Sequence, residues 1–323
     1  MALQIGKDII GIAKQSAKGT IATQPYFAHG LADGSGIQVA PEDKAVELTS
    51  AYLNPSGPYR AKSENTAEVK TLAWEKSVGL YLLAALGSCS TAGSSPYTHT
   101  ITLGSSLLYF TIFEKKGDDA ILAIKDCKLD ELSFEWEGNE PVTMEAKFVG
   151  GAHSYPSTFT PTVNEYDSST FVTPVGGTFQ YDVDSATPVT ADVLGGKVTI
   201  KRAADPKVYS GALEAGDVWE GACEVEAMLK VNPTDTTLWR TLVTGTAAGT
   251  AIGSTPTMGS FLIKFMNGTD YLQLAASSVN FLCDLPPAGP AGGAAESELS
   301  GLCYRAATAT PITATVYNTQ ATY

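Results

Sequence analysis

The sequence lacks long apolar runs and has few histidines, few basic residues and none of the common catalytic motifs. Among its 323 residues there is no run of about 18 apolar residues, the length that a membrane-spanning helix requires. Residues 1–7 also lack the charged region, apolar run and cleavage site of a signal peptide. We therefore expect a protein that is made in the cytoplasm and does not enter a membrane.

Basic charge is scarce. Lys and Arg together number 21 and Asp and Glu number 34, which gives a formal net charge of −13. Nucleic-acid-binding surfaces need clustered Lys and Arg to neutralise phosphates, so we do not expect this chain to grip DNA or RNA. A surface this acidic would instead repel nucleic acid.

The cysteines do not form a recognisable framework. Their number is odd and none belongs to a C-x-x-C pair: Cys89, Cys127, Cys223, Cys283 and Cys303. Such cysteines are typical of buried thiols in a reducing compartment, and we expect free thiols here.

Histidine is rare, and the usual motifs of enzymes are missing. His29, His99 and His153 lie in segments rich in Gly, Ser and Thr, where we expect solvated loops. No H-E-x-x-H or H-x-H pattern surrounds them, and the chain has no P-loop, G-x-G-x-x-G or G-x-S-x-G motif. We therefore predict no catalytic, cofactor-binding or metal-binding residues, no cofactor and no enzymatic activity.

A run of acidic residues could still be interpreted in two ways. Its members are Asp130, Glu131, Glu135, Glu137 and Glu140. A pair of these carboxylates could serve a glycosidase. However, Glu135 and Glu137 alternate with aromatic residues, as in a strand with one solvated face. In a ring-shaped assembly, such a strand would gather its acidic residues around a common axis.

The tryptophans also allow two interpretations. Trp74, Trp136, Trp219 and Trp239 could form a platform for carbohydrate. Each lies in an amphipathic strand or at a helix, so we expect all of them in the core.

What the sequence does contain is β-forming material. Hydrophobic residues make up 44%, and 31 glycines and 17 prolines indicate strands and turns rather than long helices. The length suits two units of about 150 residues each. We expect an N-terminal arm at 1–36, a first β unit at 37–155, a linker at 156–170 and a second β unit at 171–323. Glycines should interrupt any regular element in the arm, which has little to bury and could become ordered against a neighbouring subunit.

Periodicity predicts the elements of the first unit. Strands are expected at 45–49 and 67–72, joined by a turn at 54–58 whose hairpin loop runs to about residue 65. A helix is expected over 75–86 and stopped by Gly87. Further strands are predicted at 107–113, 120–124, 128–136 and 142–149.

The second unit repeats this order. Strands are predicted at 197–201, 219–229, 261–265, 271–274, 279–285 and 298–304, with a helix that opens at 232–235 and stops at Gly245, a turn at 267–270 and a loop at 285–293. Leu80-Tyr81 before Gly87 matches Leu238-Trp239 before Gly245, and Phe148 matches Tyr304. The offsets are about 150–158 residues. We interpret this as a duplication; the alternative is two unrelated β units.

Three phrases carry a resemblance to a known family. Residues 8–23, Asp-Ile-Ile-Gly-Ile-Ala-Lys-Gln-Ser-Ala-Lys-Gly-Thr-Ile-Ala-Thr, resemble the start of siphophage tail tube proteins. Residues 132–150 resemble that family's strand, glycine turn and second strand. Gly292-Gly293 followed by Tyr304-Arg305-Ala306 and Val316-Tyr317-Asn318 is similar to its last strand. Together the phrases reach nearly from end to end.

The resemblance implies a mostly β fold of two tandem sandwich units, each with a short flanking helix. The inner sheets would form a shared β-barrel in a ring of three chains. Rings would stack through terminal arms and a long hairpin loop into a tube in the virion tail. The implied partners are further copies of the chain, a tape-measure protein in the lumen, tail terminator and distal tail proteins, and DNA in passage.

Other functions remain open at this point. A distal tail or baseplate protein could use the same fold, with one ring in each particle. A bacterial surface protein and a β-sandwich carbohydrate enzyme acting through Glu135 and Glu137 are further alternatives.

Overall fold

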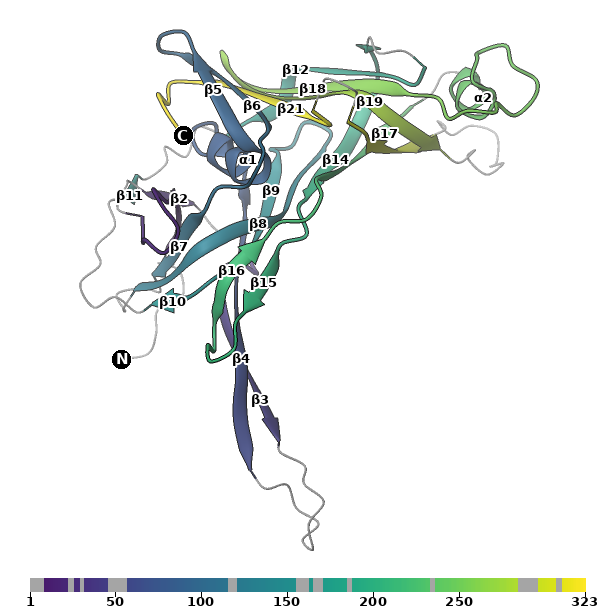
Figure 1. Cartoon of the computed structure of the whole chain (residues 1–323). Coiled ribbons are helices and arrows are strands. Elements are labelled where there is room, and N and C mark those ends of the chain that lie inside the picture. Colours follow the sequence, from purple (N-terminus) through teal and green to yellow (C-terminus); the bar gives the residue numbers. More distant parts are fainter. Residues whose placement is uncertain are drawn as a thin grey trace, which may run out of the picture.

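The computed structural model describes residues 9–22, 26–29, 32–45, 57–115, 121–154, 163–164, 171–184, 188–232, 236–283, 296–305 and 310–323. These residues form a mostly β fold in which strands far outnumber helical segments (Figure 1). In this part of the chain, neither helix is long and apolar enough to cross a membrane.

The first half contains an inner and an outer group of strands. The inner strands are β3 (Gly36–Ala45), β4 (Pro58–Leu72), β9 (Thr143–Gly150) and the second part of β8 (Ile121–Glu137). The outer strands are β2 (Tyr26–His29), β1 (Ile9–Lys14), β7 (Phe110–Lys115), the first part of β8 and β10 (His153–Ser154). The helix α1 (Val78–Leu86) packs against β8.

The second half contains the corresponding groups. Its inner strands are β14 (Val193–Lys201), β17 (Glu224–Val231), β20 (Ser297–Cys303) and the second part of β19 (Asp270–Cys283). Its outer strands are β13 (Val189–Thr190), β12 (Thr173–Asp182), β18 (Gly259–Asn267), the first part of β19 and β21 (Thr313–Asn318). The helix α2 (Thr237–Thr244) contacts β19.

Three smaller pieces connect these groups. The hairpin of β5 (Gly87–Ala92) and β6 (Tyr97–Leu103) leaves the first half and pairs with β21 of the second. The hairpin of β15 (Asp205–Val208) and β16 (Ala215–Trp219) lies between β14 and β17. The short β11 (Val163–Asn164) runs parallel to β2.

Both halves pair their strands in the same order. The inner order is β3–β4–β9–β8 in the first half and β14–β17–β20–β19 in the second. The outer orders are β2–β1–β7–β8–β10 and β13–β12–β18–β19–β21. An antiparallel pairing of β8 with β14 joins the two inner groups into one continuous sheet. The same topology therefore occurs twice along the chain.

The long strand β8 leaves the inner sheet and enters the outer sheet at Asp126. The sequence predicts two strands here, 120–124 and 128–136, and the structure has one continuous strand that bends between those segments. Asp126 has a φ of 57°, which is uncommon outside glycine and bends the strand. Its carboxylate accepts hydrogen bonds from the Gly19 amide (2.6 Å) and the Gln15 side chain (3.2 Å), so the bend is held by the N-terminal segment.

The N-terminal segment is more regular than the sequence indicates. The expectation that glycines would interrupt any element in 1–36 was wrong for β1, which pairs with β7 and buries Ile10 and Ile12 completely. A Cβ atom at Gly11 would lie 1.5 Å from the Phe113 ring. The glycine is therefore required by the ring that covers the strand. Most of the linker predicted at 156–170 lies outside the described residues.

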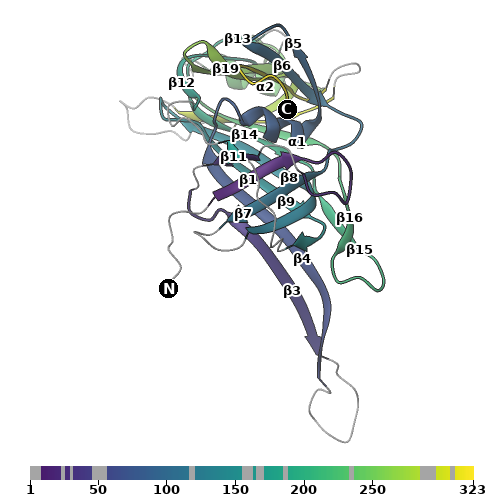
Figure 2. The same ribbon diagram turned by 90° about the vertical axis from the view of Figure 1, so that its left-hand side faces the viewer.

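Several predicted boundaries also changed. The hairpin loop was expected to run to about residue 65, but β4 already begins at Pro58, and the strand predicted at 45–49 lies mostly outside the described residues. The strand predicted at 219–229 is two strands, because the chain leaves β16 at Trp219 and resumes pairing at Glu224. Figure 2 shows the long β3–β4 hairpin that results, projecting away from the body of the molecule.

Both helices end as the sequence predicts. Gly87 and Gly245 follow them with φ values of 88° and 84°, a left-handed conformation that glycine adopts at low cost. The core lies between the inner sheet, the outer sheet and α1. Its largest fully buried side chains include Tyr81, Phe134, Phe148, Phe265 and Phe281.

Candidate assembly surface

Side chains of the inner sheet alternate between the core and an open face. In β9, Met144, Ala146 and Phe148 are buried, whereas Glu145 and Lys147 point to the open face. β17 follows the same rule, with Val225, Ala227, Leu229 and Val231 inside. This alternation is what an antiparallel sheet with one solvated face requires. The core thus fixes which residues lie on the open face.

Charges of opposite sign follow one another across that face. The strand registers place Glu68 opposite Lys147, Lys147 opposite Glu131, Glu131 opposite Lys201 and Lys201 opposite Glu224. This row crosses five strands and passes from the first half into the second without a change of pattern. Opposite charges in such cross-strand positions favour the observed register.

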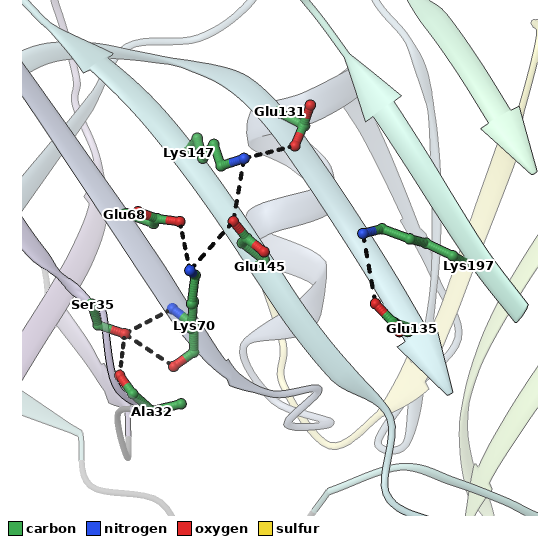
Figure 3. Close-up of polar contacts among 9 residues, drawn as sticks. All are labelled: Ala32, Ser35, Glu68, Lys70, Glu131, Glu135, Glu145, Lys147 and Lys197. Carbon is green, nitrogen blue, oxygen red and sulfur yellow. Dashed lines mark hydrogen bonds and ion pairs between the residues drawn. The ribbon is translucent and has the colours of Figure 1, made fainter. Parts of the chain in front are cut away.

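Ion pairs connect neighbouring strands within this pattern (Figure 3). Lys147 Nζ lies 3.0 Å from a Glu131 oxygen and 3.3 Å from Glu145, and Lys70 Nζ lies 3.8 Å from Glu145. Between the halves, Lys197 Nζ lies 3.6 Å from Glu135. The hydrogen bond to Glu131 raises the pKa of Lys147. Because these side chains are largely solvated, each pair contributes only about 0–1 kcal/mol, so the pairs set register more than stability.

The open face carries an excess of acid. Its glutamates are Glu68, Glu131, Glu135, Glu137, Glu145, Glu224, Glu226 and Glu298, and its lysines are Lys70, Lys147, Lys197, Lys201 and Lys230. Most of the lysines are held by glutamates, as in the pairs Lys201–Glu226 (2.7 Å) and Lys230–Glu137 (3.4 Å). The face therefore offers few free cations to a polyanion and keeps a surplus of negative charge.

The predicted acidic run is divided by the fold. Glu131, Glu135 and Glu137 lie on the open face of β8, as expected for a strand with one solvated side. Asp130 instead accepts a hydrogen bond from the Ala204 amide at 2.8 Å, where β14 has ended. Glu135 and Glu137 contact Lys197 and Lys230 on an open sheet, an arrangement that suits a charged surface better than a paired catalytic acid and base.

The two ends of the inner sheet are open. In the described part of the chain, β3 pairs with β4 alone, and the end of β19, Asn280–Cys283, pairs with β20 alone. At the start of β3 the Ile37 amide donates to a Glu114 oxygen at 3.0 Å. An exposed sheet edge is a template for pairing with another chain. The sheet therefore presents one edge from each half.

A cluster of polar contacts holds the β15–β16 region of the second half against the first half. Glu220 pairs with the buried Lys128 and accepts the Leu107 amide at 3.1 Å. Asp217 contacts Lys18 at 2.8 Å and accepts the Tyr109 hydroxyl at 2.8 Å. These contacts, together with the β8–β14 pairing, fix the two halves relative to each other.

The histidines differ from expectation. His99 is not in a solvated loop but buried in β6, where its ring contacts the Thr91 hydroxyl (2.9 Å) and the Gln320 carbonyl (2.8 Å). Burial lowers its pKa. His153 lies in β10 and contacts Glu214, which also accepts its backbone amide at 3.0 Å. The side chain of His29 lies outside the described residues. Both described histidines therefore have structural contacts.

The cysteines and tryptophans follow the predictions with one exception. All five cysteines are free thiols, and burial raises the pKa of Cys303 to about 12. The described residues contain no group of His, Cys, Asp and Glu that could hold a metal. Trp74, Trp136 and Trp239 are buried, but Trp219 is 56% exposed and lies beneath the Lys207 ammonium, 5.1 Å from its ring centre.

Comparison with known proteins gives one family. The profile of the phage tail tube protein family matches residues 8–313, which is nearly the whole chain. No curated protein matches the sequence.

Proposed function

Since the chain belongs to the phage tail tube protein family, we propose that three copies close into a ring and that such rings stack into the tube of the virion tail. The observation that carries this proposal is the repeated strand order of the two halves. Each half would act as one tube unit, as the division at 37–155 and 171–323 predicts. Three chains would then provide a wall with pseudo-six-fold symmetry.

The open sheet edges support ring closure. The β8–β14 contact joins the last inner strand of one half to the first inner strand of the next. The corresponding contact between copies would join β19 of one chain to β3 of its neighbour. Repeating it around an axis leaves no unpaired edge, which is the usual advantage of a closed barrel. A chain that already contains half of these junctions needs fewer separate bodies to associate.

The acidic open face would then line the lumen. DNA passing through the tube would meet paired lysines and surplus glutamates, so that it is repelled rather than held. A tape-measure protein would occupy the lumen before ejection. Tail terminator and distal tail proteins would close the two ends. In this function the face acts through its charge, and the chain needs no catalytic residue or cofactor.

The projecting β3–β4 hairpin would connect successive rings. The hairpin extends well beyond the body of the molecule (Figures 1 and 2), as a contact to a stacked ring requires. Several exposed ion pairs lie along it, including Arg60–Asp43 at 2.9 Å. Such solvated pairs stabilise the isolated hairpin little and remain available to a neighbouring ring.

Electron microscopy of the purified chain tests the proposal. We expect tubes or rings of three copies. Leu282→Pro, placed in the open segment of β19, should prevent closure, whereas Leu282→Ala should not, because only proline removes a backbone donor. Circular dichroism would verify that both variants fold. Two results together would contradict a tube. The purified chain would stay monomeric at high concentration, and quantitative mass spectrometry would find only enough copies per virion for one ring.

A further inference from the structure

The helix of the second half and the segment that follows it expose apolar side chains. In α1 every residue is buried, whereas in α2 only Trp239 and Thr241 are. Val243 is 51% exposed and Ile252 is 84% exposed. The helix α2 lies at one extremity of the molecule (Figure 1). Exposed large aliphatic side chains at such a place are typical of a surface that another protein covers.

The first half indicates what such a cover looks like, because its helix is covered by the second half. The Asn318 side chain donates to the Glu75 carbonyl just before α1 at 2.5 Å, and Arg202 donates to the Ala85 carbonyl at 3.4 Å. The ring of Tyr323 lies against Gly79, where a Cβ atom would be 2.3 Å from it. The cover therefore comes from β21, the C-terminal residues and the end of β14.

The hairpin after α1 completes this arrangement. β5 begins at Gly87, directly after α1, and β6 pairs with β21 in the register Thr100 opposite Thr315. β21 in turn lies beside the outer part of β19. The β5–β6 hairpin, which follows α1, thus extends the outer sheet of the second half. It does so by pairing with β21, the strand next to β19.

In the first half, β10 occupies the position that β21 occupies in the second half. It lies beside the outer part of β8, with His153 opposite Ile124, as β21 lies beside β19. In the described part of the chain, no further strand pairs with β10; Glu214, which lies between β15 and β16, contacts His153 of this strand. The counterpart of the β5–β6 hairpin is the segment 246–258, which follows α2. Among the described residues, no strand pairs with this segment.

We propose that α2 and the segment 246–258 of one copy dock on the outer sheet of the first half of the next copy, beside β10. The site rests on the proposed ring and names the contact that accompanies each β19–β3 junction. Its occupant is a second copy of the same chain, since the first half of that copy supplies the surface that the second half supplies within the chain.

Local contacts make this docking part of ring closure. The Trp239 indole donates to Cys283 Sγ at 3.1 Å, which ties α2 to the open end of β19. The Gly253 amide donates to the Val243 carbonyl at 3.0 Å, and Asn280 donates to the Thr257 carbonyl at 3.1 Å. The helix, the segment and the edge strand are thus connected. A neighbour that pairs with β19 is brought next to the exposed Ile252.

Photo-crosslinking in assembled tubes tests the contact directly. Ile252 is replaced by p-benzoylphenylalanine, and tubes are assembled from a mixture of ¹⁴N- and ¹⁵N-labelled chains and irradiated. We expect mixed-isotope peptides that join position 252 to residues 121–154 of another copy. Crosslinks confined to the same chain, or to the second half of a neighbour, would overturn the proposal.

A pair of substitutions covers the case in which the photoreactive variant does not assemble. Ile252→Asp should lower the yield of tubes at least tenfold without changing the melting temperature of the monomer, and Ile252→Leu should assemble like the wild type. Wild-type yield from Ile252→Asp would overturn the docking site but leave the ring intact. Failure of the wild-type chain to form rings would instead contradict the proposed function, and the docking site with it.

Discussion

The two helices occupy equivalent places in equivalently paired sheets, yet one is fully enclosed and the other is largely exposed. α1 is covered by the second half of its own chain, whereas among the described residues nothing covers α2 in the same way. The two halves therefore have the same topology but differ in how far their helices are covered. The helix of the first half is covered when the chain folds, and we infer that the helix of the second half is covered when chains assemble.

The largest test of this contrast compares a leucine in each helix. Leu82→Ala removes a side chain that is completely buried in α1, and we expect a loss of about 3–4 kcal/mol in the free energy of unfolding. Leu242→Ala in α2 should cost about 1 kcal/mol in the monomer, because Leu242 is only partly buried. Urea denaturation of the unassembled chain measures both. Equal losses would show that the helices are equally enclosed.

The next test addresses the contact that holds the halves together. Lys128 is 7% exposed at its side chain and pairs with Glu220, so Lys128→Met leaves a carboxylate with no cation. We expect a loss of about 2–3 kcal/mol, since removing one partner of a buried pair is costly.

Lys197→Met is the matched control for Lys128→Met. Its partner Glu135 is solvated, and the loss should be about 0.5 kcal/mol. If the two variants lose the same amount, Lys128 does not anchor the second half.

A third test would make α1 resemble α2. Tyr323→Ala removes the ring that lies on Gly79 and the hydroxyl that accepts a hydrogen bond from the Asn318 side chain at 2.7 Å. We expect a loss of about 1–2 kcal/mol and faster amide exchange in 78–86 than in the wild type. Unchanged exchange in α1 would mean that the C-terminal cover does not protect the helix.

The smallest expected effect is a loss of folding stability at acidic pH. Burial alone would raise the pKa values of Glu214, Asp217 and Glu220, but hydrogen bonds outweigh it and lower all three, with His153, Lys18 and Lys128 of the first half among the donors. Groups with lowered pKa values stabilise the fold fully above their ordinary values of 4.5 for Glu and 3.8 for Asp. This stability is lost as the pH falls through the lowered values.

The free energy of unfolding measured between pH 6 and pH 3 would show this loss. Glu220→Gln should flatten the acid limb, because it removes one of the titrating groups. A slope unchanged by that substitution would assign the acid sensitivity to other carboxylates.

Much of the fold could be predicted from local pattern. Gly87 and Gly245 marked the helix ends because only glycine takes the left-handed conformation there at low cost. The alternation around Glu135 identified the solvated face of β8. These features depend on residues close together in the sequence, where periodicity is a direct signal.

Other features depended on partners distant in the sequence. Gly11 looked like a break in β1, but it provides room for the ring of Phe113. His99 looked like a loop residue, but Thr91 and Gln320 satisfy its ring in the core. The match of Phe148 with Tyr304 was misplaced, since Phe148 is buried and Tyr304 is half exposed. In each of these cases, the surroundings of the residue depend on which strands pair around it.

The site shows the same division. The acidic residues of β8 could be recognised in the sequence, but the row that continues through Lys201 and Glu224 depends on the register between the halves. No local pattern specifies that register. The exposed end at α2 was also not predicted, although α1 is apolar throughout and α2 carries Thr237, Arg240 and Thr244 among its apolar residues.

The most direct test of the account is a cross-section of the assembled tube by cryo-electron microscopy at a resolution that separates strands. We expect three chains in each ring, with β19 of one chain paired to β3 of the next and the charged face of β4, β9, β8, β14 and β17 toward the lumen. Six chains in each ring, or a lumen lined by the outer strands, would contradict it.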